Sequence, residues 1–153
     1  MMARERRWRN GVRVTVGCMA LGLLTAAAAQ AQPAGRTVWD GVFTQAQAAR
    51  GKAAYDQTCA ACHGASLAGV DVAPSLSGLR FLSAWGGTTA GELFDRIHTT
   101  MPQTDPGSLS GRMVSDIEAY IFEANGFPAG ATELPTDSAR MQQVRIVANK
   151  PGG

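Results

Sequence analysis

The stretch Thr58–Gly69, TCAACHGASLAG, carries two thiols separated by two residues and an imidazole directly after the second thiol. Cysteine and histidine side chains bind transition metals and take part in redox chemistry. Three interpretations compete for this run. It is a redox disulfide between Cys59 and Cys62, half of a zinc site, or the attachment point of a haem with His63 on the iron.

The rest of the chain offers little to complete a zinc site. A structural zinc ion needs four ligands, usually including a second pair of cysteines or histidines. Outside the run the sequence has only Cys18 and His98 as residues of these two types. Zinc is therefore short of ligands.

The sequence before the thiols argues against a redox disulfide. A thioredoxin-like motif follows a β-strand within a βαβ unit. Here the approach, residues 44–58, reads TQAQAARGKAAYDQT and is rich in alanine and glutamine, which favours a helix. A structural disulfide with a two-residue spacer would close too small a loop to stabilise the fold much.

A covalently attached haem gives all three side chains a role. The thiols of Cys59 and Cys62 bond to the two vinyl groups of the haem, and His63 binds the iron. We therefore expect one haem c as the cofactor.

Residues 1–31 have the layout of a secretory signal peptide, with a basic stretch, an apolar run and an Ala29-Gln30-Ala31 cleavage site. We predict cleavage after Ala31 and export to the periplasm, where haem attachment of this kind takes place. The alternative is an uncleaved N-terminal anchor. The apolar run is shorter than the roughly 20 residues that span a bilayer comfortably, so we expect no membrane span in the mature chain.

Removal of residues 1–31 changes the charge balance of the chain. Five arginines and Glu5 leave with the segment, so nine basic and eleven acidic residues remain. The lysines of the whole chain are Lys52 and Lys150. A mildly acidic protein without a basic stripe is not expected to bind nucleic acid.

The hydrophobic pattern predicts an all-α fold with three main helices. A capping box of Thr44 and Gln47 begins a helix over about 45–57, and one of Thr89 and Glu92 begins a helix that ends near Thr99. Ser110 is the expected N-cap of the third helix, whose apolar face is Val114, Ile117, Tyr120, Ile121 and Ala124.

The connecting segments are rich in glycine, proline and serine. Residues 64–88 predict a long loop with one short helix near 79–84. Gly51, inside the first helix, costs about 1 kcal/mol relative to alanine and indicates that another backbone comes close. The tail, residues 129–153, has room for one or two helical turns after Asp137, and it either lies over the domain or is disordered.

Met101 is the expected second axial ligand of the iron. It lies between the middle helix and Pro102, in a segment where proline prevents regular structure. Met113, Met141 and His98 are weaker candidates. A histidine near a helix C-terminus is also favoured there electrostatically, so His98 has a structural explanation as well.

These motifs together resemble a class I cytochrome c. The runs that carry the resemblance are CAACHG, APSLSG at residues 73–78, TTMP, and DIEAYIFEANGFP. The resemblance covers residues 45–128, with a signal peptide at 1–31, a lead at 32–44 and a tail at 129–153. It implies the cytochrome c fold, in which three main helices and long loops wrap around one covalently attached haem.

The resemblance also implies roles for individual residues. The carbonyl of Pro74 would accept a hydrogen bond from His63, and Leu76 would pack on the haem. Arg80 and Trp85 would donate to the haem propionates. In the helices, Gly51 and Tyr55 of the first would meet the last at the positions Ile117, Tyr120 and Ile121.

The implied function is that of an electron carrier and not of an enzyme. Histidine and thioether ligation favours ferrous iron and raises its potential, which suits transfer from a dehydrogenase to a higher-potential oxidase or cytochrome. The flanks VWDGVFTQAQAARG and NGFPAGATELP are similar to those of small cytochromes that accompany quinoprotein dehydrogenases. The alternative is a haem protein with an open iron position, which would bind small ligands or react with peroxide.

Overall fold

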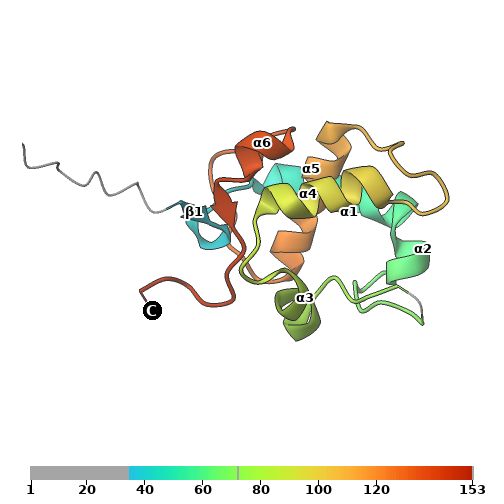
Figure 1. The fold of residues 1–153 in the computed structure, drawn as a ribbon, viewed down its shortest axis with the longest axis horizontal. Coiled ribbons are helices and arrows are strands. Elements are labelled where there is room, and N and C mark those ends of the chain that lie inside the picture. The colour runs from blue at the N-terminus through green and yellow to red at the C-terminus, as the bar shows by residue number, and fades with distance from the viewer. Residues whose placement is uncertain (1–34, 72, 153) are drawn as a thin grey trace, which may run out of the picture. The chain divides into compact units, whose positions relative to one another are not determined.

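The computed structural model describes residues 35–71 and 73–152, and the predicted signal peptide lies outside them. The described chain is mostly helical (Figure 1). Its helices are α1 (Gln45–Thr58), α2 (Ala60–His63), α3 (Gly78–Trp85), α4 (Ala90–Thr100), α5 (Gly111–Ala124) and α6 (Ser138–Met141). A 3-10 turn, η1, spans Val38–Asp40. Strands β1 (Arg36–Thr37) and β2 (Val144–Arg145) form a short parallel pair. The predicted all-α fold is confirmed.

The three main helices begin at the expected capping residues. Thr89 and Glu92 form the full capping box of α4, with Glu92 N–H donating to the Thr89 hydroxyl at 3.1 Å and Thr89 N–H donating to the Glu92 carboxylate at 2.7 Å. Ser110 accepts a hydrogen bond from Met113 N–H and caps α5. These side chains satisfy backbone donors that have no partner within the helix.

The predicted capping box of α1 is only half formed. Thr44 accepts a hydrogen bond from Gln47 N–H at 3.1 Å, but the Gln47 side chain does not return to Thr44. It is 1% exposed and bonds instead to Ser115 on α5 and to Leu134 in the tail. The long-range partners win because the buried amide finds both a donor and acceptors there.

Helices α1 and α5 cross in direct backbone contact at Gly51. A Cβ atom at this position would overlap the carbonyl oxygen of Asp116, so a residue with a side chain cannot take its place without moving the helices. Beside the crossing, the Arg50 guanidinium holds the Asp116 carboxylate at 2.8 Å. Tyr55 packs edge-on against Tyr120, with ring centroids 5.4 Å apart. The close approach that Gly51 indicated is therefore present.

The tail lies over the domain and contributes to its core. Met141 and Ile146 are fully buried, and Leu134 is 2% exposed. The indole N–H of Trp39, before α1, donates to the carbonyl of Val147 at 3.0 Å. The parallel pair of β1 and β2 joins the same two parts of the chain. Lead, helices and tail thus share one hydrophobic core.

Glu118 on α5 is the most unusual residue of this core. Its side chain is fully buried, and within the described residues neither carboxylate oxygen has a hydrogen-bond partner. Burial, and secondarily the charge of Asp95 on α4, raise the pKa of Glu118 well above its ordinary value. The folded protein therefore favours the neutral form of this carboxyl group.

Substitution Gly51→Ala tests the helix crossing. Helix propensity alone would stabilise the variant by about 1 kcal/mol. Overlap with Asp116 should reverse this and lower the free energy of unfolding by about 2 kcal/mol, as overpacking does in other cores. Denaturant unfolding of the variant and the wild type measures this difference in the free energy of unfolding. The reverse exchange at an exposed site of the same helix, Ala53→Gly, is the control and should cost about 1 kcal/mol. A stabilised Gly51→Ala variant would contradict the crossing.

Glu118 should make stability depend on pH. Between the carboxyl's unfolded pKa and its raised pKa in the folded protein, the folded state binds more protons than the unfolded state. The contribution of the neutral carboxyl to the free energy of unfolding is therefore complete below the unfolded pKa. It is lost as pH rises towards the folded pKa, by at most about 1.4 kcal/mol per pH unit. In Glu118→Gln this decline above about pH 4.5 should disappear. Unfolding free energies measured from pH 4.5 to 8 decide it, and equal slopes in both proteins would refute the assignment.

Candidate functional site

The two thiols and His63 sit where α1 ends and α2 begins. Cys59 ends α1, and α2 carries Cys62 and His63 on a single turn. Both cysteines are free thiols, Cys59 half-buried and Cys62 exposed. The hydroxyl of Tyr55 donates to the carbonyl of Gly64 at 2.7 Å and so ties the end of this turn to the face of α1 that packs on α5.

The two thiols lie in different surroundings. Burial raises the pKa of Cys59, while the Thr58 hydroxyl, 3.3 Å from its sulfur, acts in the opposite direction. Cys59 also packs against the hydrophobic core. The Cys59 thiol therefore lies against the protein core, and the Cys62 thiol faces solvent.

His63 is held with one ring nitrogen occupied. It is 8% exposed, and its Nδ1 atom lies 2.9 Å from the carbonyl oxygen of Pro74. Because a carbonyl can only accept, Nδ1 carries the proton and Nε2 is left with its lone pair. This is the state in which imidazole binds a metal, and a hydrogen bond of this kind fixes the ring and makes it a better ligand. The bond that the family resemblance implies is present.

A tightly turned loop brings Pro74 to His63. The carbonyl of Leu67 accepts hydrogen bonds from Leu76 N–H at 2.8 Å and from the Ser75 hydroxyl at 3.1 Å. Gly69 has a φ of +77°, and a Cβ atom there would come within 2.6 Å of the Ala73 carbonyl oxygen. Only glycine takes this conformation without strain.

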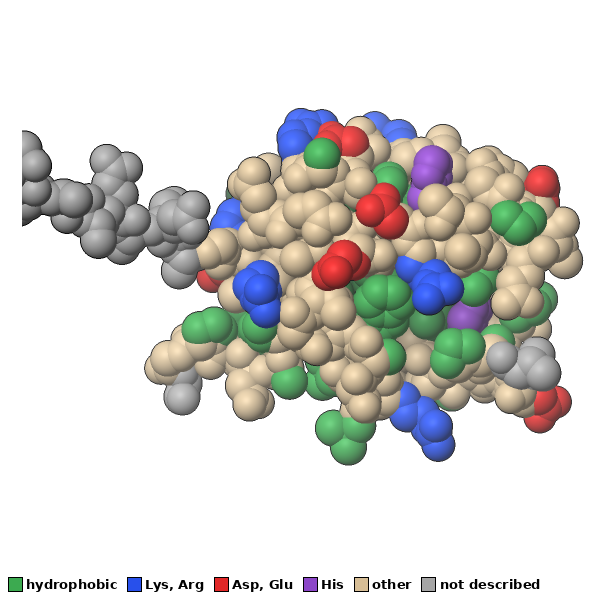
Figure 2. All heavy atoms as spheres, in the orientation of Figure 1, with side chains coloured by type: hydrophobic (Ala, Val, Ile, Leu, Met, Phe, Trp, Pro, Cys, Tyr) green, Lys and Arg blue, Asp and Glu red, His purple; other side chains and the backbone are tan. Residues whose placement is uncertain are grey.

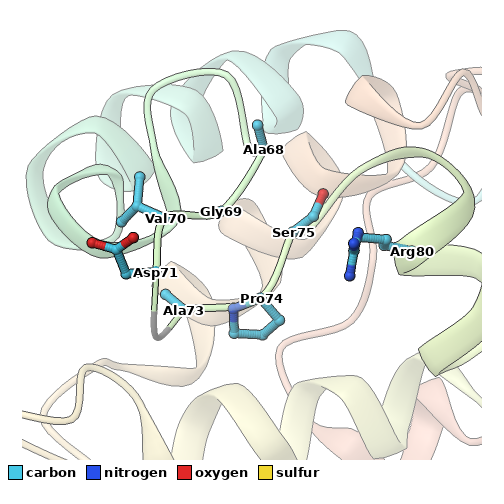
Figure 3. A pocket seen from close by; sticks show the side chains of 8 residues that line it. All are labelled: Ala68, Gly69, Val70, Asp71, Ala73, Pro74, Ser75 and Arg80. Carbon is cyan, nitrogen blue, oxygen red and sulfur yellow. The ribbon is translucent and has the colours of Figure 1, made fainter.

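Two adjoining hollows open beside this loop. One of about 500 Å³ is lined by Ala68 to Asp71, Ala73 to Ser75 and Arg80 (Figure 3). Figure 3 shows Arg80 extending from α3 towards the segment that carries Pro74 and Ser75. The second hollow, of about 290 Å³, shares Pro74, Ser75 and Arg80 and is completed by Leu76, Ser83, Ala84 and Trp85. The residues implied as haem contacts, Pro74, Leu76, Arg80 and Trp85, thus line one hollow.

Four of the predicted haem contacts lie at the partly exposed edge of the hydrophobic core, which we call the apolar margin. Cys59, Leu76, Trp85 and Met101 are all half-buried and all pack against the core, although they come from four separate segments. A group with large apolar faces would cover such a margin. Together with two free thiols and the imidazole Nε2, this margin fits a covalently bound haem.

Met101 ends α4 in an extended conformation, with its N–H donating to the carbonyl of Ile97. The three other candidate ligands lie differently. Met141 is fully buried in the core, and Met113 is 38% exposed on α5. His98 is half-buried, and its ring lies 5.6 Å from that of Phe94 on the same helix. Met101 alone of the three methionines combines half-burial with a place at the core margin.

Asn125 is a site residue that the sequence did not reveal. In the sequence it is one of the residues that end the last helix. In the structure its side-chain amide donates to the carbonyl of Leu76 at 2.9 Å, and its side-chain oxygen accepts from Gly78 N–H at 2.9 Å. It therefore holds the segment that forms one wall of the second hollow.

Comparison with protein-family models identifies the kind of domain that carries this site. Residues 46–121 match the family model described as cytochrome C oxidase, cbb3-type, subunit III. The chain belongs to the cytochrome c family. Among solved structures, the sulfane dehydrogenase SoxCD from Paracoccus pantotrophus is similar, with 23% sequence identity and a TM-score of 0.47. The match covers 70% of this chain and 61% of that one. No match is found among curated proteins.

Membership of this family makes the chain an electron-carrying haem protein. The matched residues include α1 from its second residue onward, the two thiols, His63, the loop with Pro74, and Met101. Among the described residues no helix is long and apolar enough to cross a membrane.

The bond between Tyr55 and Gly64 can be tested in this cytochrome c. In Tyr55→Phe the carbonyl of Gly64 keeps the bond from Leu67 N–H but loses the bond from the Tyr55 hydroxyl, which should lower the free energy of unfolding by about 1 kcal/mol. Tyr120→Phe is the matched control, because the described residues offer its hydroxyl no hydrogen bond. Thermal or denaturant unfolding of both variants measures the difference. Equal losses in the two variants would show that the bond to Gly64 contributes nothing.

Proposed function

We propose that this protein is an exported cytochrome c with one haem, which passes single electrons from a dehydrogenase to a higher-potential acceptor. The observation that carries the proposal is His63, placed directly after two thiols with Nδ1 on the Pro74 carbonyl and Nε2 left to bind iron. The half-buried apolar margin around it supports a large flat cofactor.

In this proposal each site residue has a defined task. Cys59 and Cys62 would hold one haem through thioether bonds, and His63 Nε2 and Met101 Sδ would bind its iron. Leu76 packs against its face, while Arg80 and Trp85 reach its propionates. Arg80 is exposed and lines both hollows, a place from which a guanidinium can meet a carboxylate.

The protein's contribution to electron transfer is to hold these ligands still. Bound haem iron supplies reversible one-electron chemistry. The Pro74 carbonyl keeps the His63 ring in one orientation. A thioether from Met101 together with this imidazole would raise the potential of the bound iron and leave it no position for a small molecule. The apolar margin limits water at the site and so favours the less charged, reduced state.

Partner proteins should dock weakly and briefly. Redox encounters usually bury less than about 1,200 Å², and with two lysines in the whole chain a strongly basic ring is not available for docking. The exposed Cys62 marks a part of the site that reaches solvent. A quinoprotein dehydrogenase is our proposed donor, on the resemblance of the flanks before α1 and after α5. A signal peptide that ends at Ala31 would place the exchange in the periplasm.

Absorption spectra of the purified protein test the ligand set. The oxidised wild type should show a sulfur-to-iron charge-transfer band, and the reduced protein should not change when carbon monoxide is added. Met101→Ala should lose the band, bind carbon monoxide and have a lower potential, because a position on the iron opens. The half-exposed Met113→Ala is the matched control and should behave as the wild type.

Two outcomes would overturn parts of this proposal. A wild-type protein that lacks the band and binds carbon monoxide has an open iron, and ligand binding or peroxide chemistry becomes the function. A protein that carries no covalent haem on a stained denaturing gel is not a cytochrome of the proposed kind. If Met101→Ala keeps a closed iron, His98→Ala in the same background identifies the ligand.

A further inference from the structure

Asn125 joins three segments of the chain with one side chain. Its amide nitrogen donates to the carbonyls of Ile121, at 2.8 Å in its own helix α5, and of Leu76, at 2.9 Å in the loop. Its side-chain oxygen accepts from Gly78 N–H at 2.9 Å, at the first residue of α3. In Figure 1, α3 lies directly below the end of α5, where this contact is made.

The chemistry of its partners fixes the orientation of this amide. Two of them are carbonyl oxygens, which can only accept, and the third is a backbone N–H, which can only donate. The reversed amide would set an oxygen against two carbonyls and an NH₂ group against the Gly78 N–H. Asn125 therefore has one satisfied arrangement and acts as a clamp with both ends in use.

The clamp acts on the wall of the proposed haem site. Leu76 and the residues that follow Gly78 on α3, namely Arg80, Ala84 and Trp85, line the second hollow. On the other side of Leu76 the loop is fixed by the bond from Leu76 N–H to the Leu67 carbonyl. Both backbone groups of Leu76 are thus hydrogen-bonded. The bond to Leu67 stays within the loop, whereas the bond from Asn125 ties Leu76 to the end of α5.

Phe81 anchors α3 in the hydrophobic core, but the first residues of the helix have no side-chain cap of their own. Its N-cap residue, Ser77, makes no side-chain capping bond to the helix. Leu79, in the first turn, is 86% exposed and contributes little packing there. The Gly78 N–H, one of the donors that a helix leaves unpaired at its start, is satisfied by Asn125 instead.

We propose that Asn125 is a positioning residue for the cofactor, which sets the reduction potential by holding Leu76 and α3 against the haem. The inference rests on the proposed function and adds a residue outside the stretch that matches the family. Without the clamp, the wall can move away and admit water, which stabilises the oxidised form and lowers the potential. Asn125 does not touch the iron in this scheme; it acts through Leu76 and α3.

The test compares Asn125→Ala with Gly126→Ala in the haem-loaded protein. Gly126 follows at the same helix end with a φ of +82°, and a Cβ atom there meets nothing within 4 Å. Its alanine variant therefore strains the end of α5 without touching the clamp. Spectroelectrochemistry gives the potential, and amide hydrogen exchange gives the protection of Gly78 N–H.

Asn125→Ala should lower the reduction potential. At the midpoint potential of the wild type, the ratio of oxidised to reduced variant should be about three or more. Exchange at the Gly78 amide should quicken by roughly tenfold. Gly126→Ala should lower stability and leave both readouts at the wild-type values. Asn125→Gln keeps the amide but moves it by one methylene, so it should change the reduction potential and the Gly78 exchange rate in the same directions by smaller amounts. This variant serves as the test if the alanine variant does not fold.

Other results would overturn the inference in distinguishable ways. A haem-loaded Asn125→Ala protein with wild-type potential and wild-type exchange at Gly78 refutes the clamp and leaves the proposed function intact. An equal shift of potential in Gly126→Ala assigns the effect to loosening of the helix end and refutes a positioning role. A wild-type protein without covalent haem refutes the proposed function, and this inference with it.

Discussion

The contact of α1 with α5 at Gly51 is the constraint on which the rest of the structure depends. Backbone meets backbone there, and the ion pair of Arg50 with Asp116 and the ring contact of Tyr55 with Tyr120 lie on either side. The crossing fixes two helix ends that build the site. Helix α1 leads directly to the thiols and His63, and α5 leads to Asn125, which holds the opposite wall.

The site itself is made mainly from loops, and hydrogen bonds give those loops their shape. The Leu67 carbonyl accepts hydrogen bonds from Leu76 and Ser75. The Pro74 carbonyl bonds to the His63 ring. The Asn125 side chain bonds to Leu76 and Gly78. The surface shown in Figure 2 carries acidic and basic side chains intermixed, without a single-sign field over this face. Specific local bonds, more than long-range charge, therefore define the arrangement of the site.

The segments outside the family match complete the core around these elements. Gln47, buried in α1, bonds to Ser115 of α5 and to both backbone groups of Leu134, so that one amide joins two helices and the tail. Met141 and Ile146 then fill space that the main helices leave open. A buried polar group with every partner satisfied favours one arrangement of the tail over others. Glu118 is the contrast, since its buried carboxylate has no hydrogen-bond partner among the described residues and is expected to cost stability as pH rises.

Local patterns in the sequence were sufficient for the three main helices, the motif of two thiols and a histidine, and the close approach at Gly51. Capping residues and periodic apolar positions act within a few residues of chain, so they can be recognised one segment at a time. The family resemblance supplied Pro74 and the other expected contacts in the hollow. The long-range roles of two polar residues escaped: the sequence assigned Gln47 to a capping box, and it assigned Asn125 to the end of a helix.

The partners of those two residues explain why only the tertiary structure could decide their roles. Asn125 bonds to Leu76, 49 positions away, and Gln47 bonds to Leu134, 87 positions away. A short polar side chain satisfies whichever donors and acceptors the fold brings to it, and nothing in the neighbouring residues records which these are. The sequence by itself thus determined what the site is made of and which helices approach each other. The packed fold decided how the tail closes the core and what holds the wall of the site, because both depend on contacts that exist only after the chain has folded.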